Sequence, residues 1–152
     1  MSNFDSTIDT REHIQNIRRV FLEKFLPELL QRFAVHDQSK LEEPERSCYD
    51  EFIPKIRVAE YGSDEYEEIR SQMQRDGLDH HYQVNRHHPE HFPNGVNGMN
   101  LIDFVEYVLD CYAASMRSKT PFEKTMKTNM DKYDIPEMLQ NIVFNTVHDL
   151  DL

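Results

Sequence analysis

Apolar side chains recur every three or four residues along much of this sequence, and this spacing limits the fold more than any other feature. Between residues 9 and 33 the repeated positions are Ile14, Ile17, Phe21, Phe25, Leu29 and Phe33. The spacing places these side chains on one face of a helix, whereas a half-buried strand would show alternation with period two. With only four glycines, no tryptophan and no alternating β-branched run, the sequence predicts an all-α protein.

Capping residues and prolines mark where further helices begin. Pro27 is expected to kink or divide the first segment, and residues 85–100, with two prolines and two glycines, are expected to form an irregular loop that lines a site. At 152 residues the chain has the size of one ordinary domain, so we expect a single helical bundle over residues 1–152. The helices after the first are expected to start at Pro44, Asp64, Asn100, Thr120 and Asp134.

Charge and cysteine usage exclude several classes of function. Seventeen basic and 28 acidic residues give a formal charge of −11, which opposes binding to a nucleic acid polymer but not to a small nucleotide held through a metal. No apolar run approaches the roughly 20 residues of a membrane helix, and no leader sequence is evident. Cys48 and Cys111 have no metal-type spacing, which favours a reducing, cytoplasmic setting. A second copy of the chain is left open as a partner.

Histidines gather in two places. His36 precedes Asp37, and five more histidines fall within twelve residues. Neutral imidazoles and carboxylates are common ligands of divalent transition metals, so the distribution predicts a metal site. A solvated loop with adventitious metal affinity is the alternative for the five clustered histidines. They are His80, His81, His87, His88 and His91.

A late helix supplies acidic candidates for the same site. Asp103, Glu106 and Asp110 are spaced by three and four residues and therefore share one helix face. Asp103 is the third residue after Asn100, where a carboxylate is expected to cap the helix. Asp110 lies mid-helix among apolar residues, where a carboxylate is unfavourable unless a cation or metal pairs with it. His13, beside an apolar stripe, is either a hydrogen-bonded core residue or a ligand.

These motifs resemble the HD-domain superfamily. Residues 36–40 (HDQSK) are similar to the HD-x-x-K box of the HD-GYP phosphodiesterases, His80-His81 to the start of their HHE box, and residues 109–114 (LDCYAA) to their late aspartate segment. Nearly the whole chain also resembles a family of short bacterial and phage proteins, without an established activity, marked by HD-x-SKL, YGSDEY, HHYxxNxHHPEH and a late DxxAA segment. Tyr82 replaces the glutamate after the double histidine, and the GYP part is absent, so a cyclic-dinucleotide substrate is not implied.

The resemblance implies an HD-type bundle that holds one or two divalent transition metals (Mn, Fe, Co, Ni or Zn). The implied ligands are His13, His36, Asp37, His80, His81 and Asp110. Asp37 and Lys40 are the expected catalytic residues, because a cation beside the ligands can stabilise developing negative charge. The residues assigned to substrate binding, or to a second metal, are Asn85, Arg86, His87, His88, His91 and Glu106.

The expected function is metal-dependent hydrolysis of a small phosphate ester, such as a nucleotide, through a metal-activated water. Two alternatives stay open on the same scaffold. One is a dinuclear iron oxygenase, since some HD proteins perform redox chemistry. The other is a non-catalytic helical module in which the metal has only a structural role. A fold does not separate these three functions.

Overall fold

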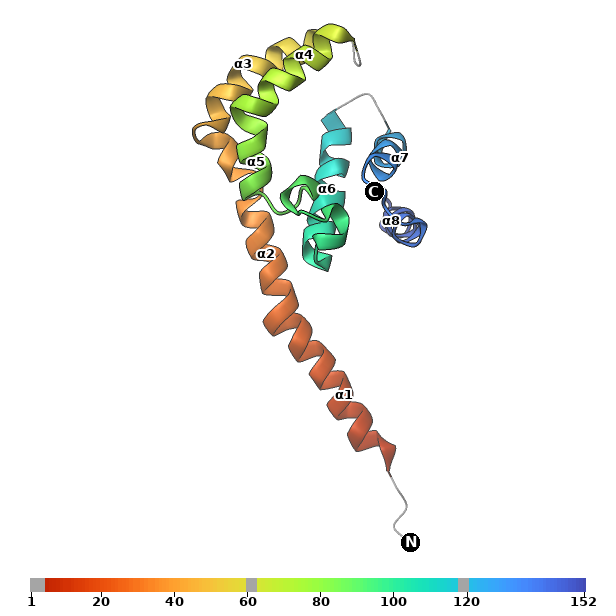
Figure 1. Ribbon diagram of the computed structural model, residues 1–152. Helices are drawn as coiled ribbons and strands as arrows, with labels where there is room; N and C mark the ends of the chain where they lie inside the picture. Colours follow the sequence, from red (N-terminus) through yellow and green to blue (C-terminus); the bar gives the residue numbers. More distant parts are fainter. Residues whose placement is uncertain (1–4, 60–62, 118–120) are drawn as a thin grey trace. The chain divides into compact units, whose positions relative to one another are not determined.

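The computed structural model describes residues 5–59, 63–117 and 121–152, and all regular structure in these ranges is helical (Figure 1). The all-α prediction is therefore confirmed. The chain divides into two compact units, residues 1–36 and residues 37–152. A single domain over 1–152 stays a prediction. The expected cap Thr120 lies outside the described residues.

The first unit is one helix built from three segments. These are α1 (Ser6–Val20), the π-helical turn η1 (Phe21–Phe25) and α2 (Leu26–Val35). The side chain of Asp5 caps the start by accepting a hydrogen bond from the backbone N of Thr7 at 2.9 Å. Pro27 lies in the first turn of α2, directly after the π turn. A proline lacks the N–H of a regular helical turn, and the widened turn accommodates it without ending the helix.

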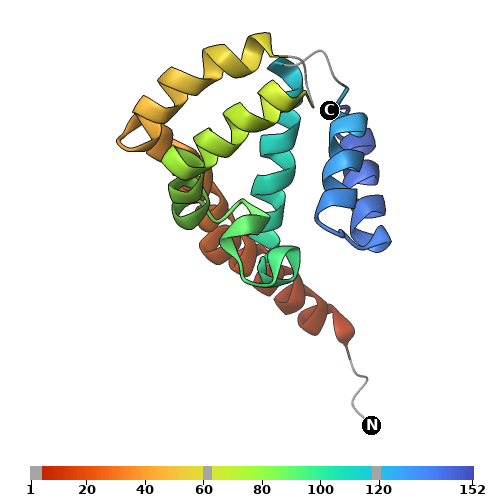
Figure 2. The same cartoon turned by 45° about the horizontal axis from the view of Figure 1, so that its top comes forward.

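The second unit contains the remaining helices. The segments α4, η3 and α5 follow one another without a break, and in both Figure 1 and Figure 2 α6 lies between α5 and the α7–α8 pair. The elements of the second unit are η2 (Gln38–Leu41), α3 (Glu45–Val58), α4 (Asp64–Met73), η3 (Gln74–Leu78), α5 (Asp79–Val84), η4 (Pro89–His91), η5 (Gly95–Gly98), α6 (Leu101–Arg117), α7 (Phe122–Lys132) and α8 (Glu137–Asp149).

No described helix is both long and apolar enough to cross a membrane.

Two apolar clusters hold this second unit together. The smaller cluster joins α3 and α4 through Cys48, Phe52 and Met73. The larger cluster joins α6, α7 and α8, and its buried members are Phe104, Tyr107, Cys111, Phe122, Met126, Met130, Ile135 and Val143. Residues 85–100, which were expected to be irregular, form short 3₁₀ turns between α5 and α6.

The start of α6 agrees with the sequence prediction. The side chain of Asn100 accepts from the backbone N of Asp103 at 2.9 Å, and the Asp103 carboxylate accepts from the backbone N of Asn100 at 3.0 Å. This reciprocal pair satisfies two amides that the first helical turn leaves free. At α4 the prediction was wrong by one residue, because Ser63 is the cap and accepts from the backbone N of Tyr66.

Gly77 allows α3 and η3 to approach closely. A Cβ at this position would lie 2.6 Å from the Cys48 Sγ and 2.7 Å from the Cys48 Cβ, which is closer than van der Waals contact permits. The helical segment therefore tolerates a residue of poor helix propensity because no larger side chain fits there. This packing fixes α5, and with it His81, against the start of α3.

Candidate metal centre

Asp37 begins the second unit in an unusual backbone conformation. Its φ of 57° and ψ of 12° lie in the left-handed region, which aspartate tolerates better than most residues with a Cβ. The turn η2 follows at once, with Asp37 as the residue before its first position. One carboxylate oxygen of Asp37, Oδ2, forms an ion pair with Lys40 Nζ. The other oxygen, Oδ1, faces two histidines.

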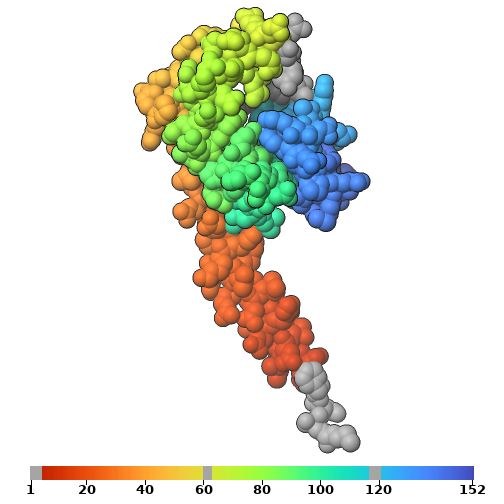
Figure 3. All heavy atoms as spheres, viewed as in Figure 1, coloured from red at the N-terminus to blue at the C-terminus, as the bar shows by residue number. Residues whose placement is uncertain are grey.

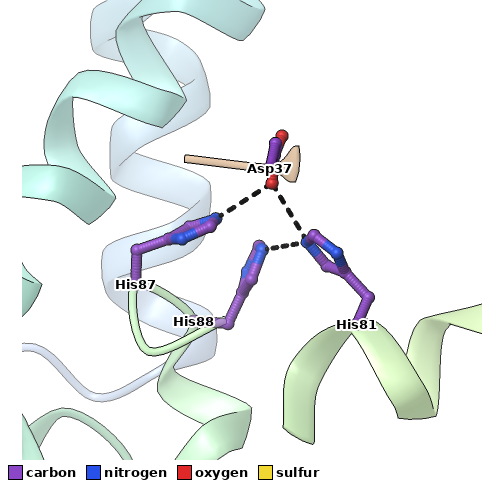
Figure 4. Close-up of side chains that lie close together, drawn as sticks. All are labelled: Asp37, His81, His87 and His88. Atoms are coloured by element: carbon purple, nitrogen blue, oxygen red, sulfur yellow. Dashed lines mark hydrogen bonds and ion pairs between the residues drawn. The ribbon is translucent and has the colours of Figure 1, made fainter. Parts of the chain in front are cut away.

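Those histidines are His81 and His87, and both present Nε2 to the same oxygen (Figure 4). The Nε2 of His81 lies 3.4 Å, and that of His87 3.5 Å, from Asp37 Oδ1. Hydrogen bonds between such atoms are shorter, about 2.7–3.2 Å. Two ligands of one tetrahedral ion, each about 2.1 Å from it, are about 3.4 Å apart. Each histidine nitrogen therefore lies from Asp37 Oδ1 at the spacing expected of two ligands of one metal ion.

A buried carboxylate orients each of these imidazoles. Glu45, at the start of α3, accepts a hydrogen bond from His81 Nδ1 at 2.8 Å, and Glu106 Oε1 on α6 lies 3.3 Å from His87 Nδ1. Glu45 is 0% exposed and Glu106 is 2% exposed. The hydrogen bond to Glu45 fixes the proton of His81 on Nδ1 and leaves the lone pair of Nε2 toward the metal, an arrangement typical of histidine ligands, and Glu106 forms an ion-pair contact with the corresponding nitrogen of His87.

His88 supplies a third nitrogen and a fourth candidate ligand atom. Its Nε2 lies 2.8 Å from His81 Nε2, and one ligand atom from each of Asp37, His81, His87 and His88 lies within 4.8 Å of the others (Figure 4). Because Glu45 holds the proton of His81 on Nδ1, His88 donates to His81 Nε2 when both rings are neutral. To take a tetrahedral position beside His81, the His88 nitrogen would move by about 0.6 Å.

The environment favours the neutral forms of His81 and His88. Burial lowers the pKa of His81, and the nearby charge of Lys40 lowers it further. Burial, His87 and His81 lower the pKa of His88 to about 2, although the charge of Asp110 opposes that shift. Neutral imidazole is the form that binds a metal, so both shifts favour metal binding by these two side chains.

Asp110 belongs to the same neighbourhood. It lies on α6, and one of its carboxylate oxygens is within 4.8 Å of a carboxylate oxygen of Asp37. Two carboxylates at this separation repel each other unless a cation lies near both. The structure thus brings together Asp37, His81 and Asp110 from the expected ligand set.

His80, the neighbour of His81, does not contribute to this cluster. The Nδ1 of His80 pairs with Glu45 Oε1 at 2.7 Å, and its side chain is 41% exposed, so His81 is the member of the pair that reaches the cluster. His13 is an exposed residue of α1, and His36 is the last residue of the first unit. The ligand roles of His13 and His36 stay predictions.

Several residues expected to bind substrate instead have structural contacts. The amide of Asn85 donates to Ser39 Oγ at 2.8 Å and to the His81 carbonyl oxygen at 3.0 Å. Arg86 donates to both Asp103 oxygens, from Nε at 3.1 Å and Nη2 at 3.0 Å. The Nδ1 of His91 bonds to the carbonyl oxygen of Tyr82 at 3.0 Å. These contacts fix the loop that carries His87 and His88.

Sequence reasoning missed Glu45, although it is central to the geometry. Besides the two histidines, this carboxylate accepts from Ser39 Oγ at 2.9 Å. The signal was weak, because Glu45 is one of five acidic residues in the stretch 42–51 and follows Pro44 like an ordinary first-turn acid. The sequence assigned three residues to substrate binding or to a second metal, whereas the structure places them at the candidate metal centre. They are His87, His88 and Glu106.

Comparison with known proteins places the chain in a family. No curated protein and no solved structure matches it. A family model described as a family of unknown function, DUF5662, matches residues 2–149. That match covers nearly the whole sequence, including all residues of the candidate metal centre, and the chain therefore belongs to the family DUF5662.

Proposed function

We propose that this protein binds a divalent transition metal at Asp37, His81 and His87 and uses it to hydrolyse a small phosphate ester. One observation carries the proposal: two buried histidines, each oriented by a buried carboxylate, present Nε2 to the same Asp37 oxygen at 3.4 and 3.5 Å. His88 and Asp110 are available as further ligands. Mixed nitrogen and oxygen donors suit Mn, Fe, Co, Ni or Zn better than calcium.

The chemistry follows from the donors and from Lys40. A metal ion in such a site supplies a Lewis acid for the phosphoryl oxygen and lowers the pKa of a coordinated water. Asp37 and Lys40 are 22% and 29% exposed, whereas His81 and His87 are 1% exposed, so a substrate has access from the Asp37–Lys40 side. The Lys40 ammonium on that side favours an anionic substrate such as a phosphate.

The choice of a phosphate ester rests on the resemblance to HD proteins, most of which are hydrolases. Residues 36–40 and Asp110 carry that resemblance, and an HD-type bundle is part of the same proposal. A nucleotide is the favoured substrate, since the net charge of −11 opposes long polyanions but a metal can hold a small one. The two free, buried cysteines are consistent with a reducing, cytoplasmic compartment.

A structural metal is the second candidate, and the burial of the ligands favours it. His81 comes from α5, His87 from the following loop, and their carboxylates from α3 and α6, so one ion would tie these elements together. A structural ion needs no approach route for a substrate, and the 1% exposure of both histidines satisfies that condition.

Turnover measurements separate the two candidates. Protein freed of metal with a chelator is reloaded with Mn, Fe, Co, Ni or Zn and offered nucleoside phosphates and simple phosphate esters, and released phosphate is measured. We expect hydrolysis that requires one of these metals and falls at least about 1,000-fold in Asp37→Ala. Asp50→Ala, which removes an exposed carboxylate of α3, is the matched control and should retain activity.

Each other outcome points to a different function. Stoichiometric metal without hydrolysis of any phosphate ester would contradict the hydrolase and favour the structural metal. Stoichiometric iron with oxygen-dependent changes in the optical spectrum would favour the dinuclear iron oxygenase instead.

A further inference from the structure

The helix of the first unit exposes an apolar stripe along its length. None of residues 6–35 is buried, and Ile14, Ile17, Phe21 and Phe33 are 44%, 60%, 47% and 39% exposed. Figure 3 shows these residues, coloured red to orange, as a rod one helix wide. An isolated helix is marginally stable in water and gains most of its stability by packing an amphipathic face. We therefore expect this apolar face to pack against a partner.

The π turn keeps the stripe continuous. The sequence spacing of Ile14, Ile17, Phe21 and Phe25 is three, four and four residues, and a regular helix would gradually turn a repeated spacing of four away from one face. The wider turn over Phe21–Phe25 offsets that drift. Its result is visible in the stacking of the Phe21 and Phe25 rings, whose centroids are 6.3 Å apart at an interplanar angle of 27°.

Charge indicates which partner fits. Residues 1–36 carry five basic and five acidic side chains, so the remainder of the chain carries the whole net charge of −11. A helix that lies on an anionic membrane has a polar face rich in lysine and arginine, and this one does not. Two copies that meet through their first units bring neutral segments together, so net charge does not oppose the contact.

The length of the stripe is sufficient for a stable pair. A helix over residues 6–35 is about 45 Å long. Two such helices packed along the stripe would bury on the order of 1,500 Å² in total, which is the size of a standard stable interface. A second copy also presents the same stripe, so the contact can close with two-fold symmetry and cover the stripe of both copies.

We propose that the α1–η1–α2 stripe is a dimerisation surface that pairs with the same stripe of a second copy. The proposal is independent of the metal centre, because the stripe lies wholly in the first unit. Sedimentation equilibrium of the full-length chain tests it. The wild-type chain should have twice the 18.2 kDa mass of one copy and should dissociate on dilution.

Substitution within the stripe should abolish the dimer. Ile17→Glu introduces a carboxylate into the stripe of both copies, so the dissociation constant should rise by at least about 100-fold. Phe21→Glu is a second variant with the same expectation. Ile8→Glu is the matched control, because Ile8 is 68% exposed on the same helix but lies off the stripe, and it should leave the mass unchanged. Circular dichroism verifies that each variant keeps its helices.

Two results would overturn the assignment. One is a wild-type chain that is a monomer throughout the concentration range, whether or not it binds vesicles containing anionic lipid. The other is a dimer that persists in well-folded Ile17→Glu and Phe21→Glu, because its interface would then lie outside the stripe.

Discussion

The substitution Glu45→Gln isolates the part of the site that sequence reasoning missed. Glu45 is fully buried and accepts from His80, His81 and Ser39 at 2.7, 2.8 and 2.9 Å. Glutamine has the same shape but carries no charge, and one of its two ends is a donor. That end must face a histidine or hydroxyl group that now donates to the carboxylate, so that group must change from donor to acceptor or lose its hydrogen bond, and the other hydrogen bonds weaken without the charge.

The magnitude follows from these contacts. A hydrogen bond to a charged group contributes about 1.5–3 kcal/mol, so Glu45→Gln should lower the free energy of unfolding of the metal-free protein by about 2 kcal/mol. The loss of the carboxylate that orients His81 should also weaken metal binding by about 10–100-fold. Urea unfolding measures the first quantity, and competition with a chelator of known affinity measures the second.

A matched control separates these effects from the general loss of an acid. Glu51→Gln makes the same substitution on the same helix, at a carboxylate that is 59% exposed and pairs with Lys55. Its effects should be about 0.5 kcal/mol or less on stability and close to none on metal affinity. Unchanged metal affinity in Glu45→Gln, beside an equally unaffected control, would refute the claim that Glu45 positions a metal ligand.

Three further predictions concern packing and burial. Asp103→Asn should lower the free energy of unfolding by about 2–3 kcal/mol in urea, well above the 1 kcal/mol or so of a cap alone, because Asp103 is 0% exposed and also holds Arg86. Gly77→Ala should destabilise the fold by about 2 kcal/mol in the same assay although alanine favours helices, because its Cβ would overlap Cys48; a neutral or stabilising effect would contradict the packing. Burial raises the pKa of Cys111 to about 11, so only about 0.1% is thiolate at pH 8, and both cysteines should resist alkylation until the protein is unfolded or the pH is raised toward 11.

The helical fold could be predicted because local signals decide it. The three- and four-residue spacing fixes the helix faces, and Asn100 with Asp103 forms the expected cap. Boundaries were less predictable where two residues compete for one role. Ser63 and Asp64 are both good caps, and the structure uses the first of them.

The candidate site was predictable in its residue types but not in their pairing. Spacing along the sequence cannot show whether His80 or His81 reaches Asp37, because adjacent residues on a helix point about 100° apart and the packing of α5 decides between them. The roles of Glu45 and Glu106 depend on contacts between α3, α5 and α6 that no local pattern encodes. The contact of Arg86 with Asp103 could not be predicted for the same reason, since the two residues are 17 positions apart.

X-ray absorption on the purified, metal-loaded protein tests the central claim most directly. We predict one tightly bound metal ion per chain whose ligand shell includes at least two imidazole nitrogens at about 2.0–2.1 Å. The imidazole signal should diminish in His81→Ala and in His87→Ala, whereas His148→Ala, which removes an exposed histidine, should leave it unchanged. A protein that retains no stoichiometric metal, or a shell made only of oxygen ligands, would contradict the account.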